Sequence, residues 1–181
     1  MSPLPLGILA ASGAGAAGAY ELIESSILTS SASSITFSSI PQDYKHLQLR
    51  AVARQDAASV YANAFLSLNG TPTSYWHYLY TYNTSIYSGG YGSPYGNYSF
   101  WAAGNNAATG VFAPTIMDIL DYSSSSKNTT LKYLTGYNAS SSGVGLMSNL
   151  WNNTAAVTSL TITGTGNYVA GSRFSLYGVK G

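Results

Sequence analysis

The chain has 181 residues, of which 45% are hydrophobic and only 7% are charged, and its net charge is +1. This length fits one domain with a substantial core. A nearly neutral chain has no electrostatic attraction to nucleic acid or to an anionic membrane, so we expect neither as a partner. The chain has no cysteine, which excludes a disulfide framework, cysteine-ligated zinc and thiol catalysis. Ser, Thr, Asn and 16 tyrosines take the polar role instead.

Residues 1–19 differ in composition from the rest of the chain, because they carry no charge and are rich in Gly and Ala. They lack the basic segment of a signal peptide, and their glycines and prolines argue against a membrane span. Small residues permit close backbone contact. We therefore predict an extended arm that becomes ordered against a partner, with Leu6, Ile8 and Leu9 as its anchoring side chains.

A dinucleotide-binding fingerprint, G-x-G-x-x-G, occurs within this arm at residues 13–18. That motif needs a helix to follow, because the helix N-terminus holds the pyrophosphate. The next residues, YELIESSIL, are rich in serine and β-branched side chains and indicate a strand. We predict no bound cofactor.

Residues 33–54 show the pattern that the rest of the chain repeats, two strands joined by a turn. Proline at position 41 breaks the run because it fixes φ and lacks an N–H group. In the second strand, apolar and polar residues alternate with a period of two, which is typical of a half-buried strand. Its apolar set is Leu47, Leu49, Ala51 and Ala53, and Val52 on the polar side is the exception.

Further short strands are expected along residues 20–181. A strand at 20–29 and a turn at 30–34 precede the pair just described. Later strands are predicted at 64–68, 75–82, 114–122, 129–137, 144–151, 157–163 and 173–179. Segment 114–122 also fits one helical turn, through Ile116, Ile119 and Leu120. Turns are predicted at Asn69-Gly70 and at 164–166. Short strands at this spacing predict an all-β fold, a single antiparallel β-sandwich of jelly-roll type over residues 20–181.

Residues 75–101 are rich in tyrosine, with eight of the 16 tyrosines and two tryptophans. We predict a strand at 75–82 followed by a loop. Tyrosine supplies a large amphipathic contact area at low entropic cost, while Ser, Gly and Asn adapt to a ligand. Such rings also fill core edges and oligomer interfaces, so both roles stay open. The candidate contact residues are Tyr87, Tyr91, Tyr95, Tyr98 and Trp101.

The sequence offers little for catalysis or metal binding. The two histidines, His46 and His77, lie in strands with no marked nucleophile beside them, and no G-x-S-x-G motif is present. The neighbouring carboxylates Asp118 and Asp121 would face opposite sides of a strand, as would Glu21 and Glu24. We predict no catalytic residue, no metal site and no enzymatic activity.

Both ends of the chain resemble a group of uncharacterised virion structural proteins of tailed bacteriophages, common in marine and environmental phages. The resemblance rests on I-P-x-x-Y-K-H-L-Q-L-R at 40–50, on G-S-R-F-S-L-Y-G at 171–178 and on the opening PLGILA at 5–10. The tyrosine-rich middle has no counterpart in that group.

The resemblance implies a non-enzymatic virion protein that assembles in the host bacterial cytoplasm. We expect a capsid decoration or cement protein that binds the major capsid protein and forms a homo-oligomer, with a trimer favoured. The alternative is a tail or fibre component that binds host surface glycan through the tyrosine-rich segment.

Overall fold

The structure is a computed structural model that describes residues 18–92 and 98–181. These residues form β-strands joined by turns and loops, and every strand pair is antiparallel. The predicted all-β, antiparallel fold is therefore confirmed. Among the described residues, no helix is long and apolar enough to cross a membrane.

The strands of the first half of the chain are β1 (Tyr20–Ile27), β2 (Ala32–Phe37), β3 (His46–Ala53), β4 (Tyr61–Leu68), β5 (Thr71–Pro72), β6 (Tyr75–Tyr82) and β7 (Ser85–Tyr91). Those of the second half are β8 (Tyr98–Ala103), β9 (Ala113–Leu120), β10 (Thr129–Asn138), β11 (Ser142–Trp151), β12 (Leu160–Tyr168) and β13 (Arg173–Val179).

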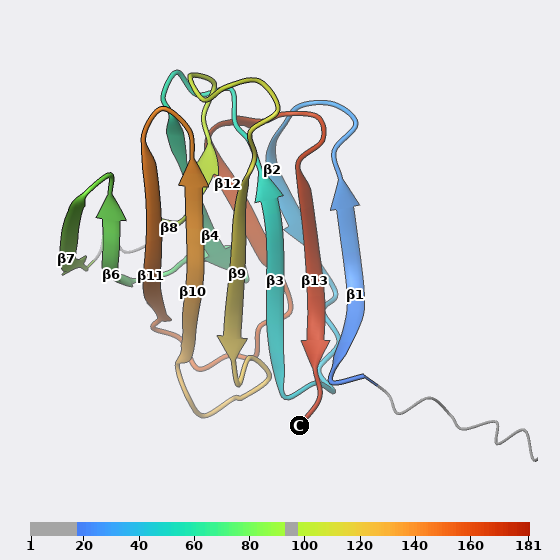
Figure 1. The fold of residues 1–181 in the computed structure, drawn as a ribbon. Coiled ribbons are helices and arrows are strands. Elements are labelled where there is room, and N and C mark those ends of the chain that lie inside the picture. The colour runs from blue at the N-terminus through green and yellow to red at the C-terminus, as the bar shows by residue number, and fades with distance from the viewer. Residues whose placement is uncertain (1–17, 93–97) are drawn as a thin grey trace, which may run out of the picture.

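The strands form two sheets that pack face to face, as Figure 1 shows. One sheet has eight strands in the order β1-β13-β3-β9-β10-β11-β6-β7. The other has five strands: four in the order β2-β12-β4-β5, and β8, which also pairs with β4. Apolar side chains from both sheets meet in one core, whose largest fully buried members include Trp151, Tyr122, Tyr133, Tyr168, Phe37, Phe100 and Phe174.

Alternation of apolar and polar residues gives the sheets their buried face. The four residues that the sequence assigns to the apolar side of β3 are buried, and Val52 is exposed. In β9, Met117 and Ile119 are buried whereas Ile116 is exposed, which is the period of a strand. The helical turn considered for this segment is therefore wrong.

The strands β2 and β3, which the sequence presents as neighbours joined by a turn, belong to different sheets. Between them the chain passes from the smaller sheet to the larger one. Ile40 is buried at this crossing, and the Gln42 side chain donates hydrogen bonds to the carbonyls of Ile40 at 2.7 Å and Val157 at 3.0 Å. Proline at position 41 thus marks a change of sheet rather than a hairpin.

The loop predicted after residue 82 is wrong, because residues 85–91 form strand β7 and strand β8 begins at residue 98. Gly89 and Gly90 lie directly opposite Tyr78 and His77 of β6. A Cβ on Gly89 would lie 2.7 Å from the Tyr78 hydroxyl oxygen, and one on Gly90 would clash with His77 Nδ1. These glycines leave room for the aromatic rings of the neighbouring strand. The segment around them is nevertheless a strand, although its Gly- and Ser-rich composition is typical of a loop.

Two other boundaries differ from the prediction. Strand β12 runs from residue 160 to 168, so Gly164 and Gly166 lie within the strand and not in a turn. A Cβ on Gly164 would lie 2.8 Å from the Gln55 side chain, and the Gly166 N–H donates to Gln55 Oε1 at 2.9 Å. The glycines thus allow Gln55 to pack against β12. At the other end of the chain, β2 begins at Ala32, inside the predicted turn at 30–34.

Most of the predicted arm, including its anchoring candidates Leu6, Ile8 and Leu9, lies outside the described residues, and so does Tyr95.

The loop between β8 and β9 is held by the side chain of Arg54, which follows β3. Its guanidinium donates hydrogen bonds of 2.8 to 3.1 Å to four carbonyls, those of Asn105, Ala107, Ala108 and Val111. The rigid fork of a guanidinium suits this geometry, whereas an ammonium group cannot reach the same set of acceptors.

Arg54→Lys is expected to lower the free energy of unfolding by about 1.5–3 kcal/mol, because hydrogen bonds to a charged group are lost and partly buried carbonyls lose their donor. Urea unfolding measures the change. Arg173→Lys is the control at an exposed position and should stay within about 0.5 kcal/mol of the wild type. Equal stability of Arg54→Lys and Arg173→Lys would show that the Arg54 contacts do not hold the loop.

Candidate functional site

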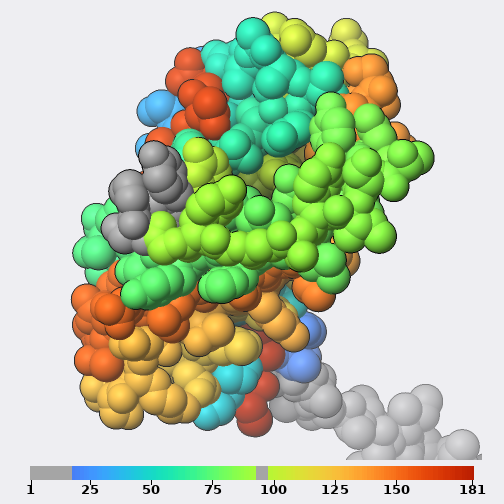
Figure 2. Space-filling view, turned by 90° about the vertical axis from the view of Figure 1, so that its left-hand side faces the viewer, coloured from blue at the N-terminus to red at the C-terminus, as the bar shows by residue number. Residues whose placement is uncertain are grey.

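The two sheets differ in width, and the difference creates a cleft at one edge of the molecule. Strand β8 pairs with β4 at one edge of the smaller sheet. It packs over β9, β10 and β11 of the larger sheet. The β6–β7 hairpin continues the larger sheet beyond this edge and projects from the body in Figure 1. In Figure 2 the green residues of this hairpin cross the face nearest the viewer.

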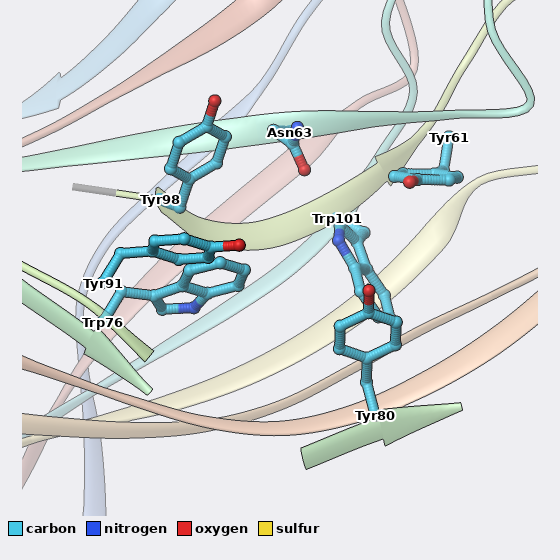
Figure 3. Close-up of a pocket in the computed structure, with 7 residues that line it drawn as sticks. All are labelled: Tyr61, Asn63, Trp76, Tyr80, Tyr91, Tyr98 and Trp101. Carbon is cyan, nitrogen blue, oxygen red and sulfur yellow. The ribbon is translucent and has the colours of Figure 1, made fainter. Parts of the chain in front are cut away.

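The cleft between the hairpin and strands β4 and β8 has a volume of about 360 Å³. Its lining consists of six aromatic residues and one asparagine, drawn in Figure 3: Tyr61, Asn63, Trp76, Tyr80, Tyr91, Tyr98 and Trp101. This volume lies in the range of about 300–1,000 Å³ that is typical of small-molecule sites.

Strand alternation directs the aromatic residues of β6 toward the cleft. Trp76, Tyr78 and Tyr80 are partly buried on the inner side of the strand. Tyr75 and Leu79, which alternate with them along the strand, point to the opposite face and are exposed. Within residues 18–92 and 98–181, no strand of the smaller sheet packs over this inner side, and aromatic rings cover it instead.

Two groups of rings face each other across the cleft, as Figure 3 shows. In the first group, the Tyr91 ring stacks on Trp76 with centroids 5.9 Å apart and planes 14° apart. Tyr98 from β8 lies 5.5 Å from Trp76. Tyr91 is 50% exposed, so a broad aromatic face is open to solvent on this side.

The second group is centred on Trp101, which is nearly buried. Its ring meets Tyr80 edge-on at 5.2 Å and lies 5.7 Å from Tyr61. Tyr61 in turn stacks on Tyr137 at 4.8 Å. These contacts join the cleft wall to the hydrophobic core, so this side is rigid.

Asn63 lies between the two groups and supplies the polar group of the cleft. Its backbone carbonyl accepts hydrogen bonds from Gln55 Nε2 and Thr165 Oγ1, both at 3.1 Å, which fix the strand at this point. An asparagine amide has both donors and an acceptor. Nothing in the described part of the chain makes a hydrogen bond to this amide, so it is available to a ligand.

Buried polar side chains of the larger sheet hold β8 in place. Thr135 Oγ1 accepts a hydrogen bond from the Trp101 N–H at 3.1 Å and shares another, of 2.8 Å, with Thr115 Oγ1. Asn149 Nδ2 donates to the Tyr98 carbonyl at 2.9 Å. The two cleft residues of β8 are therefore positioned by direct bonds to their backbone.

Among the described residues, the lining has no carboxylate and no basic side chain. Burial raises the pKa of Tyr61 and of Tyr80, so both phenols are neutral at physiological pH. The carboxylates of Asp118, Asp121 and Glu21 form ion pairs with lysines elsewhere on the molecule. Across residues 18–92 and 98–181, no three His, Cys, Asp or Glu side chains are grouped so that they could hold a metal ion.

The structure brings three of the five candidate contact residues together, since Tyr91, Tyr98 and Trp101 line the cleft. Tyr87, on strand β7, stacks on Tyr80 with ring centroids 5.2 Å apart, and it is 44% exposed. Tyr95 lies outside the described residues.

Four lining residues are not among the candidates from the sequence: Tyr61, Asn63, Trp76 and Tyr80. For Trp76 and Tyr80 a signal existed, because the alternation of residues 75–82 puts them on one side of a strand. Tyr61 and Asn63 reach the cleft through the pairing of β4 with β8, which no local pattern indicates.

Comparison of the chain with protein-family models, with curated proteins and with solved structures gives no match.

Thr135→Val is expected to lower the free energy of unfolding by about 1–3 kcal/mol, because it leaves the buried Trp101 N–H without its acceptor. Thr130→Val on the same strand is the matched control, since Thr130 is exposed. Chemical unfolding of both variants measures the difference. If the two variants are equally stable, β8 is not held by this bond.

Stability should decline above pH 10. Burial raises the pKa of Tyr133 and Tyr168, and it raises the pKa of Tyr137 to about 12. In an unfolded chain tyrosine ionises near pH 10. The folded state therefore holds these protons more tightly, and the resulting stabilisation is complete below about pH 10 and is lost as the pH rises toward the folded-state values.

We expect the final part of the rise in tyrosinate absorbance, which belongs to these buried phenols, to coincide with the cooperative loss of the native circular dichroism spectrum. Ionisation of all 16 tyrosines while the circular dichroism spectrum stays native would contradict the burial of these three phenols.

Proposed function

We propose that the protein is a non-enzymatic bacteriophage virion protein with a jelly-roll β-sandwich, and that it binds uncharged carbohydrate in the aromatic cleft. The observation that carries this proposal is the cleft itself: two groups of aromatic rings face each other with one asparagine amide between them.

The strand order supports the jelly-roll assignment. A jelly roll places eight strands in two four-stranded sheets, as two Greek keys. Strands β1-β13-β3-β9 and β2-β12-β4-β8 supply such a pair of sheets. Along the chain these eight strands alternate between the two sheets, except that β4 and β8 follow one another in the smaller sheet and pair with each other. On this assignment β5, β6 and β7 are one insertion, and β10 and β11 are another. Viral capsid and lectin domains both use this fold.

The chemistry of the cleft supports carbohydrate as the ligand. The apolar faces of sugar rings pack on aromatic rings, and tyrosine and asparagine groups can bond sugar hydroxyls. The described lining residues carry no formal charge, so they offer no opposite charge to a phosphate or carboxylate. Uncharged sugar units therefore fit the site better than acidic ones.

The same lining supports binding rather than hydrolysis. Glycoside hydrolases of the common type place two carboxylates on either side of the scissile bond. The cleft has none within its lining. The proposal therefore assigns the aromatic residues a role in recognition alone.

The virion setting rests on the resemblance of both chain ends to tailed-phage virion proteins. That resemblance is compatible with the head and with the tail, and our first hypothesis is decoration of the head, in contact with the major capsid protein. The glycan-binding cleft favours a tail or fibre position. Immunogold electron microscopy of intact virions separates the two: label over the head supports decoration, label at the tail or fibre tips supports receptor binding, and absence of label from all parts of the virion contradicts both.

Binding to an array of bacterial surface glycans tests the cleft, with affinity then measured by calorimetry for the best neutral oligosaccharide. Tyr91→Ala and Trp76→Ala should each weaken binding by roughly tenfold, the factor that corresponds to about 1.4 kcal/mol, because each removes a stacking face. Tyr75→Ala is the matched control, because Tyr75 lies on the same hairpin, is 45% exposed and points to the opposite face.

Equal loss of binding in Tyr75→Ala and Tyr91→Ala would place the ligand elsewhere. Binding of none of the neutral glycans, by a protein whose circular dichroism spectrum is native, would count against the carbohydrate proposal itself.

A further inference from the structure

The outward face of the larger sheet carries a group of exposed aliphatic side chains. We name it the outer patch, and it consists of Leu79, Ile86, Ile116, Leu134, Val144 and Leu146. These residues come from the five neighbouring strands β9, β10, β11, β6 and β7. Their side chains are between 49% and 74% exposed.

Strand register makes the patch continuous. Ile116 is the direct partner of Leu134, Leu134 of Leu146, and Leu146 of Leu79, so one aliphatic row crosses four strands. Val144 and Ile86 lie in the next row, beside Gly136 and Thr81. Aliphatic residues that are scattered singly over a surface need no explanation, but a contiguous row marks an interaction site.

The area of this face is sufficient for a stable interface. Five strands about 4.8 Å apart, each about eight residues long at about 3.4 Å per residue, cover roughly 650 Å². Two such faces in contact would bury roughly 1,300 Å² in total, within the range of about 1,200–2,000 Å² for specific interfaces.

The charges on the face favour a second copy of the chain as the occupant. On the described parts of these five strands the charged side chains are Asp118 and Lys132, which lie 3.7 Å apart in the row beside the patch. One charge of each sign gives no net repulsion between two copies. In a two-fold pair, the lysine of one copy can approach the aspartate of the other. An aliphatic centre with a polar rim is also the usual anatomy of an interface.

We propose that the outer patch is the centre of an isologous dimer interface, in which two copies pack the outward faces of their larger sheets against each other. Two-fold pairs are the commonest closed assemblies, and a self-complementary face needs no second surface. The trimer expected from the sequence resemblance would need a different arrangement.

The aromatic cleft stays open in such a dimer. Trp76 and Tyr80 lie on the inner side of β6, whereas Leu79 lies on the outer side. The dimer therefore carries two clefts on surfaces that face away from the interface. Two linked sites raise the avidity for a repetitive surface without any new contact.

The test is the mass of the full-length protein in solution, measured by light scattering after gel filtration over a series of concentrations. We expect the mass of two chains. Leu134→Lys should raise the dissociation constant by about thirtyfold or more, since it places an unpaired charge at the centre of the interface. Leu22→Lys is the matched control: both leucines are 53% exposed, but Leu22 lies on β1 at the other edge of the sheet.

Circular dichroism and thermal melting confirm that both variants are folded before their masses are compared. A dimer that dissociates in Leu134→Lys and persists in Leu22→Lys supports the proposal. A wild-type protein that is monomeric at high micromolar concentration overturns it. So does a mass of three chains, a dimer that Leu134→Lys leaves intact, or one that Leu22→Lys disrupts equally. Glycan binding by the monomeric variant is measured separately, so the outcome is independent of the cleft proposal.

Discussion

The two sheets have unequal widths, and this difference determines where the cleft and the projecting hairpin lie. The larger sheet has eight strands, and the smaller sheet covers it only as far as β8, which lies over β9, β10 and β11. An apolar inner face without a facing strand would be exposed to water at a cost that scales with its area. Here the uncovered strands β6 and β7 carry tryptophan and tyrosine, whose rings shield one another and whose polar groups reach solvent. The cleft is what remains between these rings and the edge of the smaller sheet.

The β6–β7 hairpin gives its two faces different roles through strand alternation alone. Neighbouring residues point to opposite sides, so Trp76 and Tyr80 enter the cleft while Leu79 joins the outer patch. One hairpin can thus present the proposed binding residues on one face and the proposed dimer contacts on the other. Substitution of a single residue changes one face only, which is why Tyr75 and Tyr91 make an informative pair.

Local patterns predicted the strands well and their partners poorly. The alternation in β3 and in β13 gave the correct strands, because a half-buried strand must alternate wherever it pairs. Strand β7 was missed because Gly89 and Gly90 match the composition of a loop, although they lie opposite the rings of β6. The membership of β2 and β3 in different sheets depends on pairing with the distant strands β12 and β13, which no local pattern contains.

The same limit applies to the prediction of the cleft residues. Composition identified Tyr91 and Tyr98, but Asn63 enters the cleft only through the pairing of β4 with β8.

The most direct test of the account uses the three tryptophans as reporters in one NMR titration with a neutral oligosaccharide chosen from the glycan array. Trp76 and Trp101 line the cleft, whereas Trp151 is buried at the end of β11 and is absent from the lining. The account predicts that the indole N–H signals of Trp76 and Trp101 shift with saturation while that of Trp151 stays in place. Saturable binding that leaves the signals of Trp76 and Trp101 unchanged would contradict the claim that the mismatch between the sheets creates the binding site.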